Sequence, residues 1–156
     1  NPYCKQYIPM IQKHRKLTVV DLHDYDLGNP YHKPFIDVAD ILFVSGVQIE
    51  DQASFLKEHI GDKKVVVITN GKKGSLAIDE KRNIYQQNAY LDLPLVDANG
   101  AGDTFSVAFT MHYLEHHSIK KALKFANIAG AMACESETLY HPDATYKTIY
   151  QLMHQG

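Results

Sequence analysis

The sequence has few cysteines, little net charge and no long apolar run. Its 156 residues include two cysteines, Cys4 and Cys134, which disfavours a disulfide framework and favours a reducing, cytoplasmic setting. A formal net charge of −2 with both signs interspersed argues against nucleic acid or an anionic membrane as a partner. The apolar runs are of strand length, below the roughly 20 residues of a membrane span, and the first residues lack a signal-peptide pattern.

The composition is that of a globular protein with a sizeable core, since 45% of residues are hydrophobic and 22% are charged. We find no internal repeat, linker or low-complexity tract, so a single domain over residues 1–156 is expected. The chain opens at Asn1 and runs straight into a helix-like segment. We therefore expect it to be part of a longer protein.

The first half of the sequence alternates short apolar runs with helical patterns. Strands are predicted at Leu17–Leu22, Asp40–Ser45 and Lys64–Thr69, and helices at Tyr3–Lys16 and Glu50–Ile60. Turn-forming residues predict a loop over Asp24–Pro34. Because strands that alternate with helices on short connections imply βαβ crossovers, we expect an α/β fold with a mostly parallel sheet.

The second half begins with a hairpin and ends in helices. Two short strands, Ser75–Asp79 and Asn83–Gln87, flank a charged turn at Glu80–Arg82 and predict a hairpin at the sheet edge. Helices are then predicted at Ala101–His116, Ile119–Cys134 and Ala144–His154, with Ser118 capping the second.

A glycine-bearing loop leads into the first of these helices and reads Asp97-Ala98-Asn99-Gly100-Ala101-Gly102-Asp103-Thr104-Phe105. The first amides of a helix lack intrahelical partners and attract an anion such as a phosphoryl group. Asp103 could accept a proton from a hydroxyl while the amides of Gly100, Ala101 and Gly102 hold the developing charge. The alternative is that the glycines only form a tight turn and Asp103 only complements the helix dipole.

These nine residues resemble the second signature of the ribokinase/PfkB family of sugar kinases, D-T-x-G-A-G-D-x-F, and depart from it only at Ala98. The resemblance implies a three-layer ribokinase-like fold, with this chain as its C-terminal, nucleotide-binding portion. It also implies ATP- and Mg²⁺-dependent phosphorylation of a hydroxyl on a sugar, a sugar-like molecule or a nucleoside. Asp103 then resembles the family's general base, and the Gly100–Gly102 amides resemble its anion hole.

Other landmarks of the family follow in order over nearly the whole chain. The run from Thr69 through Gly71 to Gly74 resembles its T-x-G-x-x-G turn at the nucleotide phosphates, although a plain hairpin entry is the alternative. Asn127, in Phe125-Ala126-Asn127, resembles a residue that lies beside adenine, although a packing role is the alternative. Asp97 and Asn99 resemble part of a monovalent-cation site, which leaves activation by K⁺ open.

The sequence departs from the family at three places. Ser45 stands where the family usually has Asn, Gln48 replaces the Glu that helps to organise Mg²⁺, and residues 135–139 replace T-R-x-G-A. Because a neutral amide brings no charge against Mg²⁺, we assign no protein ligand to the metal. These departures motivate an alternative function, a nucleotide-binding or regulatory domain that keeps the fold without catalysis. A Rossmann-type dinucleotide module is disfavoured because no G-x-G-x-x-G follows the first strand.

The family's first signature, of G-G-N type, is absent from this sequence. We therefore expect an N-terminal half of the same protein to supply the acceptor site. A homodimer stays open.

Two polar clusters lie apart from the glycine-bearing loop. His112 and His116 share a helix face, but no third metal ligand accompanies them, and we predict surface histidines. The segment His23–Asp26 only loosely resembles a polar motif of the family and is predicted to be a solvated loop.

Overall fold

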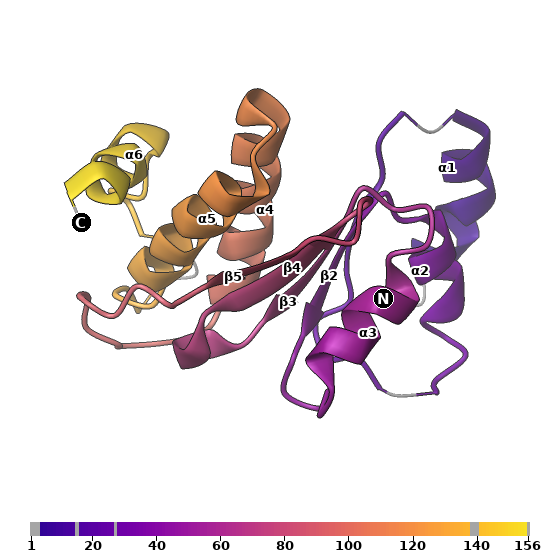
Figure 1. The fold of residues 1–156 in the computed structure, drawn as a ribbon. Coiled ribbons are helices and arrows are strands. Elements are labelled where there is room, and N and C mark those ends of the chain that lie inside the picture. Colours follow the sequence, from indigo (N-terminus) through magenta and orange to yellow (C-terminus); the bar gives the residue numbers. More distant parts are fainter. Residues whose placement is uncertain (1–3, 15, 27, 138–140, 156) are drawn as a thin grey trace. The chain divides into compact units, whose positions relative to one another are not determined.

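The computed structural model describes residues 4–14, 16–26, 28–137 and 141–155. Its sheet has five strands in the order β1-β2-β3-β4-β5, is mostly parallel and is flanked by helices (Figure 1), as the α/β prediction required. The strands are β1 Val19–Asp21, β2 Ile41–Ser45, β3 Val65–Thr69, β4 Ser75–Asp79 and β5 Ile84–Gln87. The helices are η1 Cys4–Tyr7, α1 Ile8–His14, α2 Lys33–Val38, α3 Gln52–His59, η2 Gly71–Lys73, α4 Ala101–His116, α5 Ile119–Ala133 and α6 Tyr146–Gln155.

The chain forms two compact units. The first comprises Asn1–Ile68 and Ala77–Ile84, and the second comprises Thr69–Leu76 and Tyr85–Gly156. The single domain predicted for residues 1–156 stays a prediction. Among the described residues, no helix combines the length and apolar character needed to cross a membrane.

The core of the first unit is built on its parallel strands. Strand β1 runs parallel to β2, with Val19 opposite Ile41. Residues 41–44 of β2 and 65–68 of β3 are all buried, so side chains that point to either face of these strands are covered. Such continuous apolar strands are typical of a parallel sheet with helices on both faces.

The start of the chain differs from the single helix that we predicted over Tyr3–Lys16. Within the described residues the 3₁₀ helix η1 ends at Tyr7, and the α-helix α1 begins at Ile8. Pro9 therefore lies in the first turn of α1, where its missing N–H has no intrahelical carbonyl to bond. The predicted first residue, Tyr3, and Arg15 lie outside the described residues.

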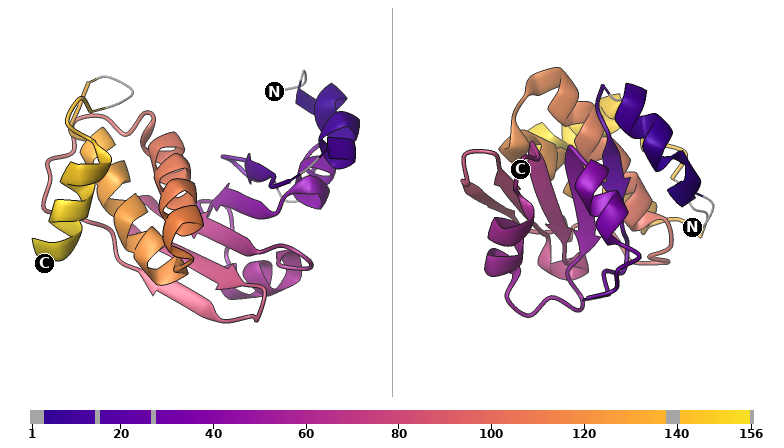
Figure 2. Two further views of the ribbon diagram at one scale, coloured as in Figure 1. Left: turned by 90° about the horizontal axis from the view of Figure 1, so that it is seen from above. Right: turned by 90° about the vertical axis from the view of Figure 1, so that its right-hand side faces the viewer.

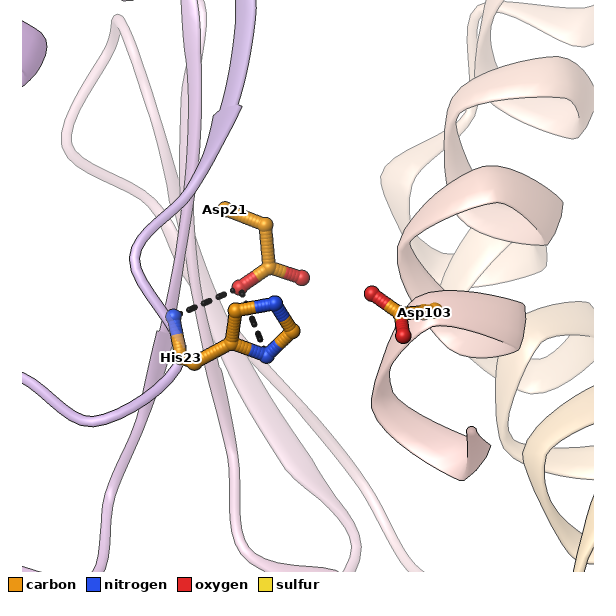
Figure 3. Close-up of side chains that lie close together, drawn as sticks. All are labelled: Asp21, His23 and Asp103. Carbon is orange, nitrogen blue, oxygen red and sulfur yellow. Dashed lines mark hydrogen bonds and ion pairs between the residues drawn. The ribbon is translucent and has the colours of Figure 1, made fainter. Parts of the chain in front are cut away.

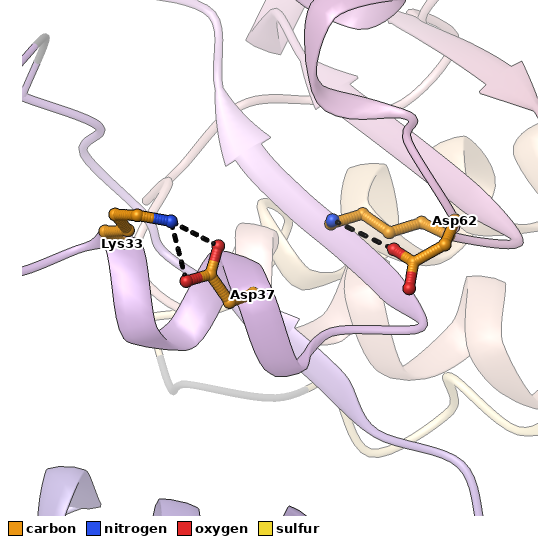
Figure 4. A network of polar contacts seen from close by, with 4 residues as sticks. Lys33, Asp37 and Asp62 are labelled. Atoms are coloured by element: carbon orange, nitrogen blue, oxygen red, sulfur yellow. Dashed lines mark hydrogen bonds and ion pairs between the residues drawn. The ribbon is translucent and has the colours of Figure 1, made fainter.

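Helix α2, Lys33–Val38, was not predicted. It follows the turn-rich loop and has Pro34 in its first turn, a position that a helix tolerates. The Lys33 ammonium lies 2.8 Å from a carboxylate oxygen of Asp37, one helical turn further along (Figure 4). Such an exposed pair supports a short helix only weakly, so the sequence carried little signal for it.

The predicted hairpin is confirmed. Strand β4 has the predicted bounds, and β5 begins one residue later than predicted, at Ile84. The Asp79 carboxylate closes the turn, because it accepts hydrogen bonds from the backbone N–H groups of Lys81 and Asn83 at 2.9 and 2.8 Å.

The second unit is dominated by three helices. Helices α4 and α5 lie side by side, and α6 packs against α5 (Figure 2). The bounds of α4 match the prediction, and the Ser118 hydroxyl caps α5 by accepting from the Lys121 N–H at 3.4 Å. Apolar side chains lie on more than one face of α4: some are buried, while Val107, Met111 and Leu114 are 59%, 55% and 46% exposed.

The prediction that His112 is a surface residue is wrong. Its side chain is 1% exposed, and the ring centroids of Phe125 and Tyr146 lie 4.8 and 6.2 Å from that of His112. In the described part of the chain, neither ring nitrogen has a hydrogen-bond partner. His116 is exposed as predicted.

Candidate active site

The start of α4, the predicted anion site, has no side-chain cap. Gly100 is the N-cap, with a left-handed φ of 78°, and no side chain caps the helix. The Ala101 N–H donates to the Ala98 carbonyl at 3.3 Å, and the first full helical bond runs from the Thr104 N–H to the Gly100 carbonyl at 2.9 Å. The Gly102 amide lies between these two bonds, in the first turn of the helix, where the backbone leaves N–H groups without intrahelical partners.

Gly102 lies within that first turn, and the protein itself gives no reason for a glycine there. A Cβ built on Gly102 would meet nothing within 4 Å. Glycine costs a helix about 1 kcal/mol relative to alanine. The residue therefore lowers helix stability and leaves open space beside the uncapped amides, as a site for a bulky anion requires.

Asp103 follows Gly102 and is exposed in the first turn of α4 (Figure 3). Its backbone carbonyl accepts a hydrogen bond from the Ser106 hydroxyl at 3.1 Å. A carboxylate at a helix start is favoured by the dipole and remains an acceptor for a proton. The predicted base and the predicted anion hole thus belong to one helical turn.

Helix α5 anchors this loop. The N–H groups of Val96 and Asp97 donate to the carbonyl oxygen of Cys134, at the end of α5, at 2.7 and 3.1 Å. Burial, and then the nearby charge of Asp97, raise the pKa of the Cys134 thiol. Gly130 lies next to the start of α4, since a Cβ there would come within van der Waals distance, 3.4 Å, of the carbonyl oxygen of Ala101.

Asp97 and Asn99 are held by each other. The Asn99 N–H donates to Asp97 Oδ1 at 3.0 Å, and its side-chain amide donates to Oδ2 at 3.1 Å. The backbone bond and then the side-chain bond from Asn99 lower the pKa of Asp97. The result is an oriented, ionised oxygen donor of the kind that a monovalent cation requires. Residues 138 and 139, the end of the segment that replaces T-R-x-G-A, lie outside the described residues.

The predicted nucleotide turn is closed by a backbone hydrogen bond, and its two glycines differ in the space around them. The Asn70 N–H donates to the Gly74 carbonyl at 2.8 Å, across η2. Gly74 has a φ of +88°, and a Cβ there would lie 2.0 Å from the carbonyl oxygen of Gln87, so the fold itself requires glycine. Gly71 has a φ of +51° but faces open space. Of the two, Gly71 is free to approach a ligand, while Gly74 packs against the chain that leaves β5.

Asn127 is engaged inside the protein. Its side-chain amide donates to the Ser75 hydroxyl and to the Leu123 carbonyl, both at 2.8 Å. Both amide hydrogens are thereby used, and the carbonyl oxygen is the group left for a ligand. Ser75 was missed by sequence analysis, since nothing local marks a serine that pairs with a residue 52 positions away.

Ser45 and Gln48, two of the positions that depart from the family pattern, lie in the first unit. Gln48 is exposed after the end of β2, and the Ser45 N–H donates to the His23 carbonyl at 2.8 Å. The His23 N–H in turn donates to Asp21 Oδ1 at 2.9 Å (Figure 3). Because Gln48 is neutral, this segment does not fit the role of a charged Mg²⁺ ligand.

All the residues predicted to form the site belong to the second unit. They are Thr69, Gly71, Gly74, Asp97, Asn99, Gly100, Ala101, Gly102, Asp103 and Asn127. Helix α5 connects their two loops, since Asn127 bonds the residue after Gly74, while Gly130 and Cys134 contact the segment that starts α4.

A mostly parallel sheet with an open helix start is typical of α/β proteins that bind phosphate-bearing ligands. The sequence profile of the family described as "pfkB family carbohydrate kinase" matches residues 36–145, and the chain belongs to this family. It is 30% identical over 118 residues to the acarbose 7(IV)-phosphotransferase of Actinoplanes sp.. The aligned region covers 73% of this chain and 40% of that protein. It is 26% identical over 114 residues to the ATP-dependent ribose-1-phosphate kinase of Halopiger xanaduensis, and the aligned region covers 71% of this chain and 38% of that protein.

Solved structures confirm the ribokinase-like fold. A microbiome-derived acarbose kinase superposes with a TM-score of 0.85 at 28% identity, over 97% of this chain and 52% of the other. The Arabidopsis thaliana ribokinase, solved with ribose and ATP, gives a TM-score of 0.77 at 22% identity, over 96% of this chain and 51% of the other, and shows the fold alone. The chain thus spans about half the length of these solved relatives.

Proposed function

We propose that the protein to which this chain belongs transfers the γ-phosphoryl group of ATP to a hydroxyl of a sugar or sugar-like acceptor, with Asp103 as the general base. The observation that carries the proposal is the start of α4, where an uncapped turn, open space at Gly102 and the Asp103 carboxylate occur together. A tight turn that served only the fold would not need glycine at position 102.

The chemistry follows from this arrangement. The acceptor hydroxyl attacks the γ-phosphorus as its proton passes to the Asp103 carboxylate, and the bond from the γ-phosphorus to the bridging oxygen of ADP breaks. The amides of the Gly100–Gly102 turn donate to the phosphoryl oxygens as charge spreads over them. The Thr69–Gly74 turn, with Gly71 as its open glycine, would hold the nucleotide phosphates.

The relatives favour a carbohydrate as acceptor. Two of them are named for acarbose, and others are named for ribose 1-phosphate and 5-dehydro-2-deoxygluconate. We infer a sugar or sugar derivative, with acarbose and pentoses as the first compounds to assay. Magnesium would enter with ATP and lower the charge repulsion at its phosphates. Asp97 and Asn99 would hold K⁺.

The test is acceptor-dependent ADP formation by the full-length protein with Mg²⁺, across acarbose, ribose, ribose 1-phosphate, 5-dehydro-2-deoxygluconate and nucleosides. Asp103→Asn should lower kcat by about a hundredfold to ten-thousandfold, since a general base contributes that much. Its dissociation constant for ATP should change little. The matched control is Asp92→Asn, which neutralises an exposed carboxylate in the loop before α4 and should leave kcat unchanged.

Two results would contradict the proposal. If the wild type binds ATP but no acceptor raises ADP formation, the chain serves as a nucleotide-binding or regulatory domain, the function that the neutral Gln48 favours. If turnover survives Asp103→Asn at the level of the Asp92→Asn control, the base lies elsewhere.

A further inference from the structure

One face of α5 supports both loops of the candidate site. Asn127, Gly130 and Cys134 are three and four residues apart and so lie on the same side of the helix or at its end. Asn127 bonds Ser75, Gly130 meets Ala101, and the Cys134 carbonyl holds Val96. A shift of α5 would therefore displace the nucleotide turn and the anion-binding turn together.

A partly buried hydrogen bond links α5 to the residue that follows the nucleotide turn. Ser75 is 1% exposed and is the first residue of β4, directly after Gly74. Its hydroxyl accepts from Asn127 at 2.8 Å, and the second amide hydrogen of Asn127 goes to the Leu123 carbonyl. These two bonds fix the Asn127 amide, and the loss of its bond to Ser75 would leave a buried hydroxyl without this partner.

The turn itself transmits this constraint. The Gly74 N–H donates to the Gly71 carbonyl at 2.9 Å, and the Lys73 N–H donates to the Asn70 carbonyl at 3.0 Å, so η2 is internally bonded. At its exit Gly74 has no room for a side chain against Gln87. The direction in which the exposed residues 71–73 face thus depends on where Ser75 is held.

We propose that Ser75 and Asn127 form a positioning pair that fixes the Thr69–Gly74 turn on α5, and that the Asn127 amide acts through Ser75 instead of donating to the nucleotide base. The inference rests on the proposed function, because the turn must bind ATP phosphates for its position to matter. It assigns Ser75 a role that its sequence context does not suggest.

The experiment compares four variants of the full-length protein with the wild type: Ser75→Ala, Asn127→Leu, the double variant and Ser118→Ala. Each change at the pair should raise the ATP dissociation constant, by calorimetry, and the KM for ATP by about three- to tenfold, the loss expected for one hydrogen bond. The kcat and the acceptor KM should change less than about twofold. Because the two residues act through one bond, their losses should not add. The ATP dissociation constant of the double variant should be no higher than that of the weaker-binding single variant.

Ser118→Ala is the matched control. It removes the cap of α5 and lowers the melting temperature without touching the pair. If Ser75→Ala lowers the melting temperature as Ser118→Ala does but leaves the ATP affinity intact, the bond is only structural and the proposal is wrong. Ser75→Ala alone decides this point, even where Asn127→Leu fails to fold.

The other outcomes distinguish a failure of the positioning pair from a failure of the proposed kinase function. A loss of ATP affinity in Asn127→Leu with none in Ser75→Ala would show that Asn127 contacts the base directly, which overturns the positioning role. If the wild type binds ATP without acceptor-dependent turnover, the dissociation constants still test the pair while the kinase assignment fails. If the wild type binds no ATP, the pair positions no nucleotide turn and both proposals fall.

Discussion

The backbone N–H of Val96 donates a 2.7 Å hydrogen bond to the carbonyl oxygen of Cys134. This bond, with its neighbour from Asp97, joins the loop before α4 to the C-terminal end of α5. A glycine-containing loop would otherwise be free to sample many conformations, so the anchor reduces the entropy that ligand binding must remove. The start of α4 is thereby preorganised by a helix that contacts it in space and follows it in sequence.

Gly102→Ala should separate stability from activity. The added methyl group meets nothing within 4 Å and removes a helix-disfavouring glycine, so the free energy of unfolding should rise by up to about 1 kcal/mol. The same methyl group occupies the space proposed for the phosphoryl group, so kcat/KM should fall by about tenfold or more. Thermal unfolding and steady-state kinetics on one preparation check both effects. Unchanged kinetics would place the transferred group elsewhere.

The two glycines of the nucleotide turn should respond differently to alanine. Gly74→Ala should prevent folding or lower the free energy of unfolding by more than about 3 kcal/mol, because its Cβ would lie 2.0 Å from the Gln87 carbonyl oxygen at a φ of +88°. Gly71→Ala has the strain of a φ of +51° without the clash and should cost about 1 kcal/mol. Chemical denaturation of both variants gives the comparison. Equal losses would contradict the close packing at Gly74.

Stability should fall on acidification because of His112. Burial, and then the charge of His116, lower its pKa from the ordinary value of 6.5; Lys121 on α5 adds to this, and Glu115 opposes it. The unfolded chain therefore binds a proton more readily than the folded one. The stabilising contribution is complete above about pH 6.5 and is lost as the pH falls towards the folded-state value.

Denaturant titrations between about pH 7.5 and pH 5.5 measure this effect. His112→Leu keeps an apolar side chain beside Phe125 and should flatten the dependence. His117→Asn is the control, since asparagine tolerates the left-handed conformation of this exposed residue, which has a φ of 51°. A slope that survives in His112→Leu, with Tyr146 still packed on the helix pair, would assign the titration to another group.

If the proposed function holds, K⁺ should activate the full-length protein through Asp97. Replacing choline chloride by potassium chloride at constant ionic strength should raise kcat, because the ionised Asp97 carboxylate is held by Asn99 beside the loop. Asp97→Asn should abolish this response and weaken the loop hydrogen bonds. Equal stimulation of the wild type and the variant would exclude Asp97 as the ligand.

Local patterns were sufficient for much of the fold. The bounds of β4 and α4 were predicted without error, since alternating and helical periodicities are local properties. Helix α2 was missed because six residues with a proline hold too few apolar positions to show a period. The family signature likewise placed the predicted site around Asp103, and this assignment stays a prediction.

Features that depend on long-range contacts could not be predicted from the sequence. The sequence suggested an exposed His112, since apolar residues lie on more than one face of α4 and periodicity does not tell which face is buried. The partner of Asn127 depends on how α5 meets the start of β4, a contact between residues 52 positions apart. The roles of Gly71 and Gly74 also looked equivalent until the chain after β5 was placed beside one of them.

The exposed stripe of Val107, Met111 and Leu114 on α4 has a practical consequence for anyone who purifies these 156 residues as a separate piece. Side chains of this kind on one helix adhere to one another and to column matrices. Glutamate or lysine at positions 107, 111 and 114 would keep the piece in solution at the concentrations that spectroscopy needs. The buried residues Phe105, Ala108 and Phe109 on the same helix would stay untouched by those changes.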